Sequence, residues 1–237
     1  MYYTPYQTYQ FRSVTRLEPE TLDRLIEIFN PDKAPEAQSA PSEQSGTAAL
    51  SGRRSVRFIE LPETGPVAVK SYARGGLVRH VIRDRYLYTG NSRPGIEFNL
   101  MSLARKAGIN VPRPIAYATR GKLFYRAWLI TRQIPANESF AELCLNQQQR
   151  ALELVPSICK SVRRLVEKRI FHVDLHPGNV LVDKDDIHYI IDFDKACFYA
   201  KSRENLAEKY RKRWERAVKK HGLPESFAAL DLERFYS

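Results

Sequence analysis

Apolar residues recur at the spacing of an amphipathic helix in several parts of the chain. The first such stretch contains Leu22, Leu25, Ile26 and Phe29 and ends at Pro31. Stretches with the same period predict further helices at 94–108, 147–168 and between 202 and 222, and a shorter helical stretch is expected at 139–145. Pro156 lies inside the pattern at 147–168, where proline is expected to kink the helix or to divide it.

Short apolar or alternating runs bounded by turn residues predict strands. Segments 53–61 and 65–72 are expected to form a hairpin around Pro62–Gly65, and 115–118 and 123–131 add two more strands. A second hairpin is predicted where an apolar run at 180–182 and another at 188–191 flank the polar turn 183–186.

These elements divide the chain into four regions. Residues 1–32 are expected to be an N-terminal extension with a short helix, and 33–50, rich in Ala, Pro, Ser, Glu, Gln and Gly, a flexible loop. Residues 51–133 carry most of the predicted strands and one helix, whereas 134–237 is mainly helical. The pattern predicts an α+β fold.

Composition is that of an ordinary soluble globular protein, since 43% of the 237 residues are hydrophobic and 27% are charged. No apolar run is long enough to span a bilayer, and the N-terminal residues do not resemble a secretory signal. The three cysteines, Cys144, Cys159 and Cys197, have no metal-site or disulfide spacing and indicate reduced cytosolic thiols.

The formal net charge of +11 favours a polyanionic partner: nucleic acid, an anionic membrane surface or a phosphorylated substrate. No nucleic-acid reading motif is present, and we expect no nucleic-acid partner. The helix between Ser202 and Gly222 combines Trp214 and Tyr210 with many basic residues. Such a helix is consistent both with ordinary packing on one face and with attachment to an anionic membrane surface.

Acidic and amide side chains flank the second predicted hairpin at fixed spacing. His172-x-Asp174 is followed by Asn179, and Asp192-Phe-Asp194 follows the second strand. Phosphoryl transfer needs a carboxylate that accepts the proton of the attacking hydroxyl, together with oxygen ligands for Mg²⁺. We therefore predict Asp174 as the base and Asn179 and Asp192 as metal ligands. Each of these residues taken alone is also a common turn former.

A lysine and a glutamate are candidates for binding nucleotide phosphates. Lys70 ends the strand sequence Val67-Ala-Val-Lys70, and Glu97 lies in the first turn of the next predicted helix. In kinases a lysine at this position contacts the phosphates and pairs with a helix glutamate. The alternatives are an exposed strand lysine and a glutamate favoured by the helix dipole.

These residues resemble those of the lipopolysaccharide kinase family, and most closely its 3-deoxy-D-manno-octulosonic acid (Kdo) kinases. The resemblance covers about residues 52–220. Shared kinase elements are Lys70, Glu97, the His172 loop and Asp192-Phe-Asp194. The more specific segments are Arg-Gly-Gly at 74–76 and Asp-Arg-Tyr-Leu-Tyr-Thr-Gly at 84–90.

The resemblance implies a two-lobed, protein-kinase-like fold. Residues 51–133 would form a small N-lobe with an antiparallel sheet and one helix, and 134–237 a compact, mainly helical C-lobe. It also implies ATP- and Mg²⁺-dependent phosphorylation of a Kdo hydroxyl on a lipid A precursor. The enzyme would act as a peripheral protein at the cytoplasmic side of the bacterial inner membrane. Gly52 would lie in the turn over the phosphates, although only one glycine is present there.

The basic segment 73–85 suggests an acceptor site, with Arg74 and Arg79 as candidate ligands for carboxylate or phosphate. A solvated basic loop is the alternative. His-Pro-Gly-Asn at 176–179 also resembles aminoglycoside-type phosphotransferases. A small-molecule kinase and a compact atypical Ser/Thr protein kinase therefore stay open. A pseudokinase or a basic membrane-binding module is disfavoured by the complete set Lys70, Asp174, Asn179 and Asp192.

Overall fold

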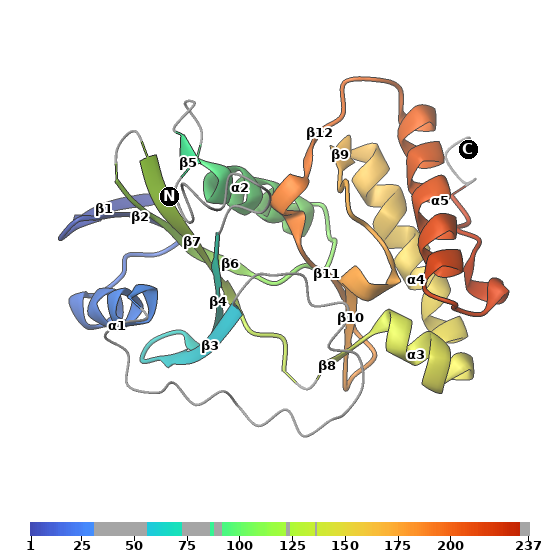
Figure 1. Ribbon diagram of the computed structural model, residues 1–237, viewed down its shortest axis with the longest axis horizontal. Helices are drawn as coiled ribbons and strands as arrows, with labels where there is room; N and C mark the ends of the chain where they lie inside the picture. Colours follow the sequence, from blue (N-terminus) through green and yellow to red (C-terminus); the bar gives the residue numbers. More distant parts are fainter. Residues whose placement is uncertain (31–55, 73–85, 88–91, 122–123, 136, 233–237) are drawn as a thin grey trace. The chain divides into compact units, whose positions relative to one another are not determined.

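A computed structural model describes residues 1–30, 56–72, 86–87, 92–121, 124–135 and 137–232 (Figure 1). Contacts divide the chain into two compact units. The first unit comprises Met1–Phe98 and Arg113–Gln133, and the second comprises Asn99–Pro112 and Ile134–Ser237.

The first unit is built on an antiparallel sheet with the strand order β1-β2-β6-β7-β4-β3, and a short strand, β5, also pairs with β7. The central strands are rich in β-branched and aromatic residues, which suit a pleated surface buried on one or both faces. The strands are β1 (Tyr2–Tyr6), β2 (Tyr9–Ser13), β3 (Val56–Leu61), β4 (Gly65–Ser71), β5 (Tyr86–Leu87), β6 (Pro114–Arg120) and β7 (Phe124–Arg132).

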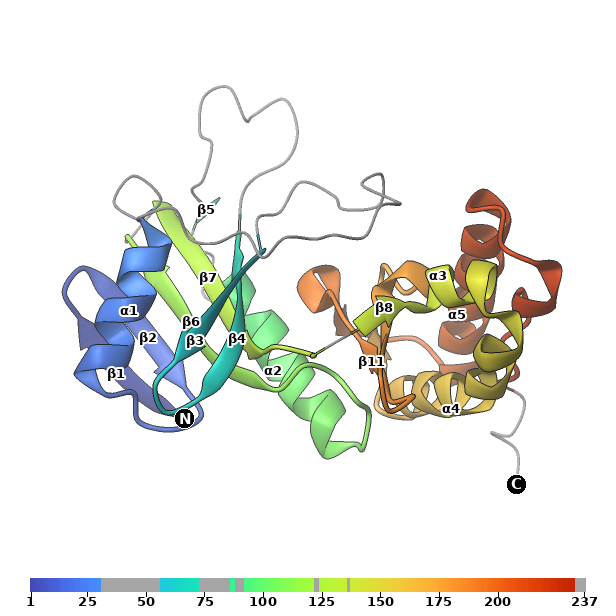
Figure 2. The same ribbon diagram turned by 90° about the horizontal axis from the view of Figure 1, so that it is seen from below.

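Helix α1 (Pro19–Phe29) covers one face of this sheet (Figure 2). Its apolar stripe is buried, and the ring of Phe29 stacks on that of Trp128 from β7 with centroids 4.3 Å apart. Strands β1 and β2 carry weak sequence patterning, but Tyr9 and Phe11 alternate with exposed residues and join this core. Residues 1–30 therefore form part of the sheet and its core.

Helix α2 (Arg93–Lys106) begins in the first unit and continues into the second. Phe98 packs against Tyr117 of β6, with ring centroids 5.5 Å apart. Gly108 has φ of +74° just beyond the helix, and the next N–H, of Ile109, bonds back to Ala104. This left-handed position explains why glycine ends the helix here, as the sequence predicts.

The described residues of the second unit form three further α-helices and two small sheets. Its strands are ordered β11-β10-β8 in one sheet and β12-β9 in the other, and all of these pairs are antiparallel. The elements are β8 (Asn137–Ser139), α3 (Phe140–Asn146), α4 (Gln148–Glu167), β9 (Ile170–Phe171), β10 (Val180–Asp183), β11 (His188–Ile190), β12 (Cys197–Phe198) and α5 (Arg203–Lys220).

Helices α4 and α5 pack together through their apolar faces (Figure 1). Trp214 of α5 is buried, and its Nε1–H donates to the carbonyl of Phe227 at 2.8 Å. Pro156 does not divide α4, which runs as one helix past it. Pro156 lies on the exposed side, and Leu152, whose carbonyl loses its usual N–H partner, is 41% exposed, so water can replace that hydrogen bond.

The described residues thus form a mixed α+β fold with five α-helices, as the sequence pattern predicts. None of the helices in these residues has the length and apolar character that a membrane crossing requires. All three cysteines lie in described residues and are free thiols.

Candidate active site

A loop between β9 and β10 carries Asp174 and Asn179. A single 3₁₀ turn at Pro177–Asn179 follows His176, whose Nδ1 accepts from the N–H of Gly178 at 3.1 Å. The side-chain amide of Asn179 donates to the backbone carbonyl of Asp174 at 2.8 Å. Because its nitrogen is used in this way, the amide oxygen of Asn179 is the end suited to a cation.

The β10–β11 hairpin places Asp192 beside Asn179. Val180 pairs with Ile190, and the N–H of Ile191 donates to the carbonyl of Asn179 at 3.0 Å. Asp192 then has φ of 63° and ψ of 61°, the left-handed region. A non-glycine residue held there is uncommon, and such residues cluster at functional sites.

His172 joins the loop to the segment that carries Asp192. It is buried, and its Nε2 lies 2.8 Å from the carbonyl oxygen of Ile191. Burial lowers the pKa of His172 to about 4, so the ring is neutral near pH 7. Since a carbonyl only accepts, Nε2 carries the proton and donates to Ile191. The ring also meets Phe193 edge-on, with centroids 4.6 Å apart.

Helix α5 supplies two side chains that contact this loop. The hydroxyl of Tyr210 donates to the carbonyl of Ile170 and accepts from the N–H of His172, both at 2.8 Å. One turn further, Arg213 Nη2 forms an ion pair with Asp174 Oδ1. Sequence reasoning placed Arg213 only among the basic residues of the helix. The spacing of Tyr210 and Arg213, which puts them on one side of a helix, was the available signal.

In the first unit, Lys70 of β4 meets Glu97 of α2. Lys70 Nζ lies 2.8 Å and 3.1 Å from the two carboxylate oxygens of Glu97. Alternation along β4 explains this contact, because Val69 joins the core beneath α1 and Lys70 points to the opposite face. The expected contact between the two residues is therefore present, and its role in nucleotide binding stays a prediction.

Tyr72 also contacts Lys70 and Glu97, which the sequence pattern did not predict. Its hydroxyl donates to Glu97 Oε2, and Lys70 Nζ lies 5.4 Å from the centroid of its ring. Glu97 is only 2% exposed, so its charge needs these partners. Lysine and tyrosine together fix the carboxylate, which in turn fixes the position of the ammonium group.

The oxygen donors of the second unit fit Mg²⁺. Among the described residues no three His, Cys, Asp or Glu side chains form a metal cluster. Asn179 and Asp192, adjacent through the hairpin, would provide only two protein ligands. Such a sparse set suits Mg²⁺, which is commonly bound by one or two carboxylates together with substrate phosphates and water.

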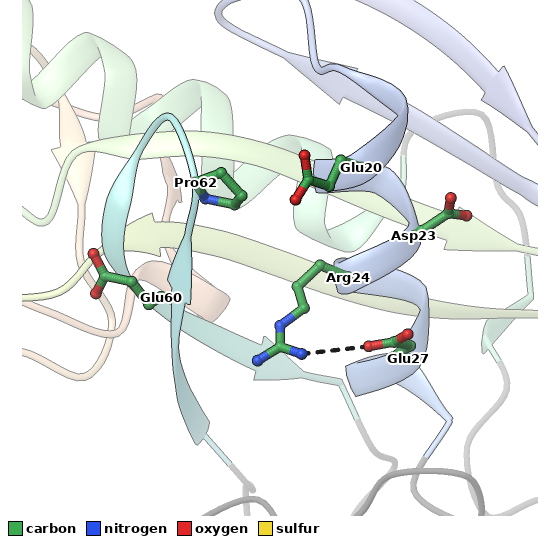
Figure 3. A pocket seen from close by; sticks show the side chains of 6 residues that line it. All are labelled: Glu20, Asp23, Arg24, Glu27, Glu60 and Pro62. Carbon is green, nitrogen blue, oxygen red and sulfur yellow. Dashed lines mark ion pairs between the residues drawn. The ribbon is translucent and has the colours of Figure 1, made fainter.

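Gly52, Arg74 and Arg79 lie outside the described residues. An open pocket of the first unit lies between α1 and the β3–β4 turn (Figure 3). Four of its six lining residues are acidic, which disfavours the phosphates of a nucleotide. It is lined by Glu20, Asp23, Arg24, Glu27, Glu60 and Pro62.

Comparison with known proteins agrees with this chemistry. A family described as "Lipopolysaccharide kinase (Kdo/WaaP) family" matches residues 42–236. A 3-deoxy-D-manno-octulosonic acid kinase of Photobacterium profundum is 37% identical over 150 residues, 62% of each chain. Proteins with the same name from Vibrio vulnificus and Vibrio cholerae are 36% identical over 167 residues and 31% identical over 194 residues. These alignments span 69% of each chain for the former, and 79% of this chain and 81% of the relative for the latter.

Proposed function

Because the chain belongs to the lipopolysaccharide kinase (Kdo/WaaP) family, we propose that it is an ATP-dependent Kdo kinase of lipopolysaccharide core biosynthesis. It transfers the γ-phosphoryl group of ATP to a hydroxyl of the Kdo sugar on a lipid A precursor. The observation that carries this proposal is the position of Asn179, whose side chain bonds to the backbone of Asp174 and whose carbonyl bonds to Ile191, the residue before Asp192. The names of the relatives supply the acceptor.

Each residue of the loop has a role in the proposed reaction. Asp174 orients the acceptor hydroxyl and accepts its proton as the new bond to phosphorus forms. Asn179 and Asp192 hold Mg²⁺, which when bound neutralises charge on the phosphates. His172 is a positioning residue, because its hydrogen bond to Ile191 fixes the backbone that presents Asp192.

Residues of the first unit bind the nucleotide in this proposal. Lys70 contacts the phosphates, and Glu97 and Tyr72 hold its ammonium group in place. Gly52 lies in the turn that covers the phosphates, and Arg74 and Arg79 bind the acceptor. The two compact units correspond to the N-lobe and C-lobe of a protein-kinase-like fold.

The enzyme works at the cytoplasmic surface of the inner membrane, attached through α5. This helix carries exposed basic side chains along its length: Lys209, Lys212, Arg216, Lys219 and Lys220. A basic helix surface is attracted to anionic lipid headgroups, at about 1 kcal/mol for each cation near the membrane.

Transfer of label from [γ-³²P]ATP tests the function. Purified protein with Mg²⁺ is expected to label a Kdo-bearing lipid A precursor but not the same lipid lacking Kdo. Asp174→Asn should lower kcat by about 10²–10⁴-fold, because the proton acceptor is lost while the side-chain shape is kept. Asp185→Asn is the matched control, since Asp185 is exposed in the hairpin turn, and should be as active as wild type.

Two results contradict the proposal. One is preferential labelling of an aminoglycoside or a basic protein from an acceptor panel, which would favour the other kinase classes. The other is full activity of Asp174→Asn on the Kdo acceptor.

A further inference from the structure

The ion pair between Arg213 and Asp174 is accessible to a ligand. The two side chains are 34% and 37% exposed. Ion pairs exposed to this degree contribute little to folding stability. The position of Arg213 at the proposed base therefore calls for a chemical explanation.

Arg213 has binding capacity beyond Asp174. A guanidinium group carries five N–H donors in a planar fork, and the contact to Asp174 uses Nη2. Its Nε is buried and has no hydrogen-bond partner among the described residues. Burial and the charge of Arg216 lower the pKa of Arg213, so contact with an anion stabilises its charged form.

An acidic sugar brings such an anion to this site. The relatives are named for 3-deoxy-D-manno-octulosonic acid, which carries a carboxylate as well as hydroxyl groups. When a hydroxyl of this sugar reaches Asp174, two carboxylates approach each other and repel. A cation that contacts both groups removes this penalty, and arginine has the geometry for it.

We propose that Arg213 binds the carboxylate of the acceptor sugar and so selects acidic sugars over neutral ones. This inference rests on the proposed function, which it extends by naming a specificity-determining residue. The fork keeps its contact with Asp174 and offers its remaining donors to the sugar.

The helix does not need Arg213 for its own position. Tyr210 bonds to both Ile170 and His172, and Trp214 bonds to Phe227. Val218 is also buried, so Arg213 variants are expected to fold.

The test crosses two acceptors with a set of variants. The acceptors are the detergent-dispersed Kdo–lipid A precursor and the same compound with the Kdo carboxylate converted to a carboxamide. The variants are Arg213→Gln, Arg213→Lys and the control Arg203→Gln, which makes the same charge change at an exposed site on α5. The kcat and KM for the acceptor and the KM for ATP are measured, with thermal unfolding to verify folding.

Arg213→Gln should lower kcat/KM for the acid acceptor by about 10–100-fold, mainly through KM, because a hydrogen bond between charged groups is lost. Arg213→Lys should keep part of this activity, since it retains the charge but not the fork. On the carboxamide acceptor, the kcat/KM values of wild type and Arg213→Gln should differ by less than about threefold, because the neutral amide forms no charge-assisted hydrogen bond with Arg213. The KM for ATP and all values for Arg203→Gln should match wild type.

An equal loss of kcat/KM on the two acceptors in Arg213→Gln would show that Arg213 acts only through Asp174. This result would overturn the present inference and leave the proposed function intact. Unchanged kinetics on the acid acceptor would overturn the inference as well. Failure of wild type to phosphorylate any Kdo acceptor would overturn the proposed function, and this inference with it.

Discussion

At the scale of single residues, Asp192 differs from an ordinary turn aspartate. Asp186 also has a left-handed backbone, with φ of 59°, but it lies exposed in the β10–β11 turn, where turn chemistry accounts for it. Asp192, with φ of 63°, instead follows a strand whose neighbouring backbone bonds to Asn179. Asp192 therefore keeps this conformation next to Asn179, the other proposed metal ligand. This position favours a metal-binding role for Asp192 over turn formation.

A buried histidine makes the stability of the second unit depend on pH. His188 lies between Ser157 and Ser161, with its Nε2 2.8 Å from the hydroxyl of Ser161. Burial lowers its pKa from 6.5 to about 4. The unfolded chain therefore takes up a proton first as the pH falls. Stability is fully present above pH 6.5 and is lost between pH 6.5 and pH 4.

We expect His188→Gln to make this dependence shallower, while His172, whose pKa is also lowered to about 4, contributes equally to wild type and variant. Between pH 6.5 and pH 5 the wild-type free energy of unfolding should fall by about 1.5 kcal/mol more than that of the variant. Urea unfolding at several pH values measures this difference. Gln148→Ala, an exposed change on α4 that leaves every titratable group in place, should follow the wild-type curve. Parallel curves for wild type and His188→Gln would show that His188 is not the titrating group.

At the scale of elements, α5 contacts the loop between β9 and β10 on one side and solvent on the other. Tyr210 and Arg213 contact the loop, whereas Lys212 and Lys219, seven residues apart, are exposed on a common side. The proposed catalytic and membrane roles therefore use different residues of the same helix.

The membrane role predicts weaker vesicle binding when the exposed lysines are removed. Lys212→Gln with Lys219→Gln should lower the partition coefficient onto vesicles containing anionic lipid by about 30-fold, at about 1 kcal/mol for each charge. Sedimentation of vesicles at low salt measures this, and added salt should weaken binding.

Lys160→Gln with Lys184→Gln is the matched control, since both lysines are exposed and lie outside α5. An equal loss in this control would mean that net charge, rather than the α5 surface, determines binding.

Elements with a local signal were predictable from sequence, and elements that depend on distant partners were not. The helices α2, α4 and α5 show their apolar period within their own residues. Strands β9 and β12 are two residues long, too short to display alternation, and exist because they pair with each other. The Lys70–Glu97 contact was predicted from the kinase pattern in which a strand lysine pairs with a glutamate of the next helix. Tyr72 and Arg213 were missed because only folding brings them to Glu97 and Asp174.

At the scale of the whole molecule, the division of α2 between two units was not visible in the sequence. Residues 93–98 of the helix, which include Glu97, group with the first unit, and residues 99–106 group with the second, because long-range contacts decide the grouping. The proposed nucleotide-binding residues Lys70 and Glu97 thus belong to one unit, and Asp174, Asn179 and Asp192 to the other. The central claim is that ATP binding depends on residues of both sets.

Calorimetric titration of ATP, with and without Mg²⁺, tests this claim most directly. Wild type should bind one ATP, and Mg²⁺ should strengthen the binding. Lys70→Gln should weaken binding at least about tenfold under both conditions, because a charged contact to phosphate is lost. Asp192→Asn should remove the increase in ATP affinity that Mg²⁺ causes. Asp185→Asn should bind ATP as wild type does, with and without Mg²⁺. The account is contradicted if either Lys70→Gln or Asp192→Asn binds ATP with Mg²⁺ as tightly as wild type.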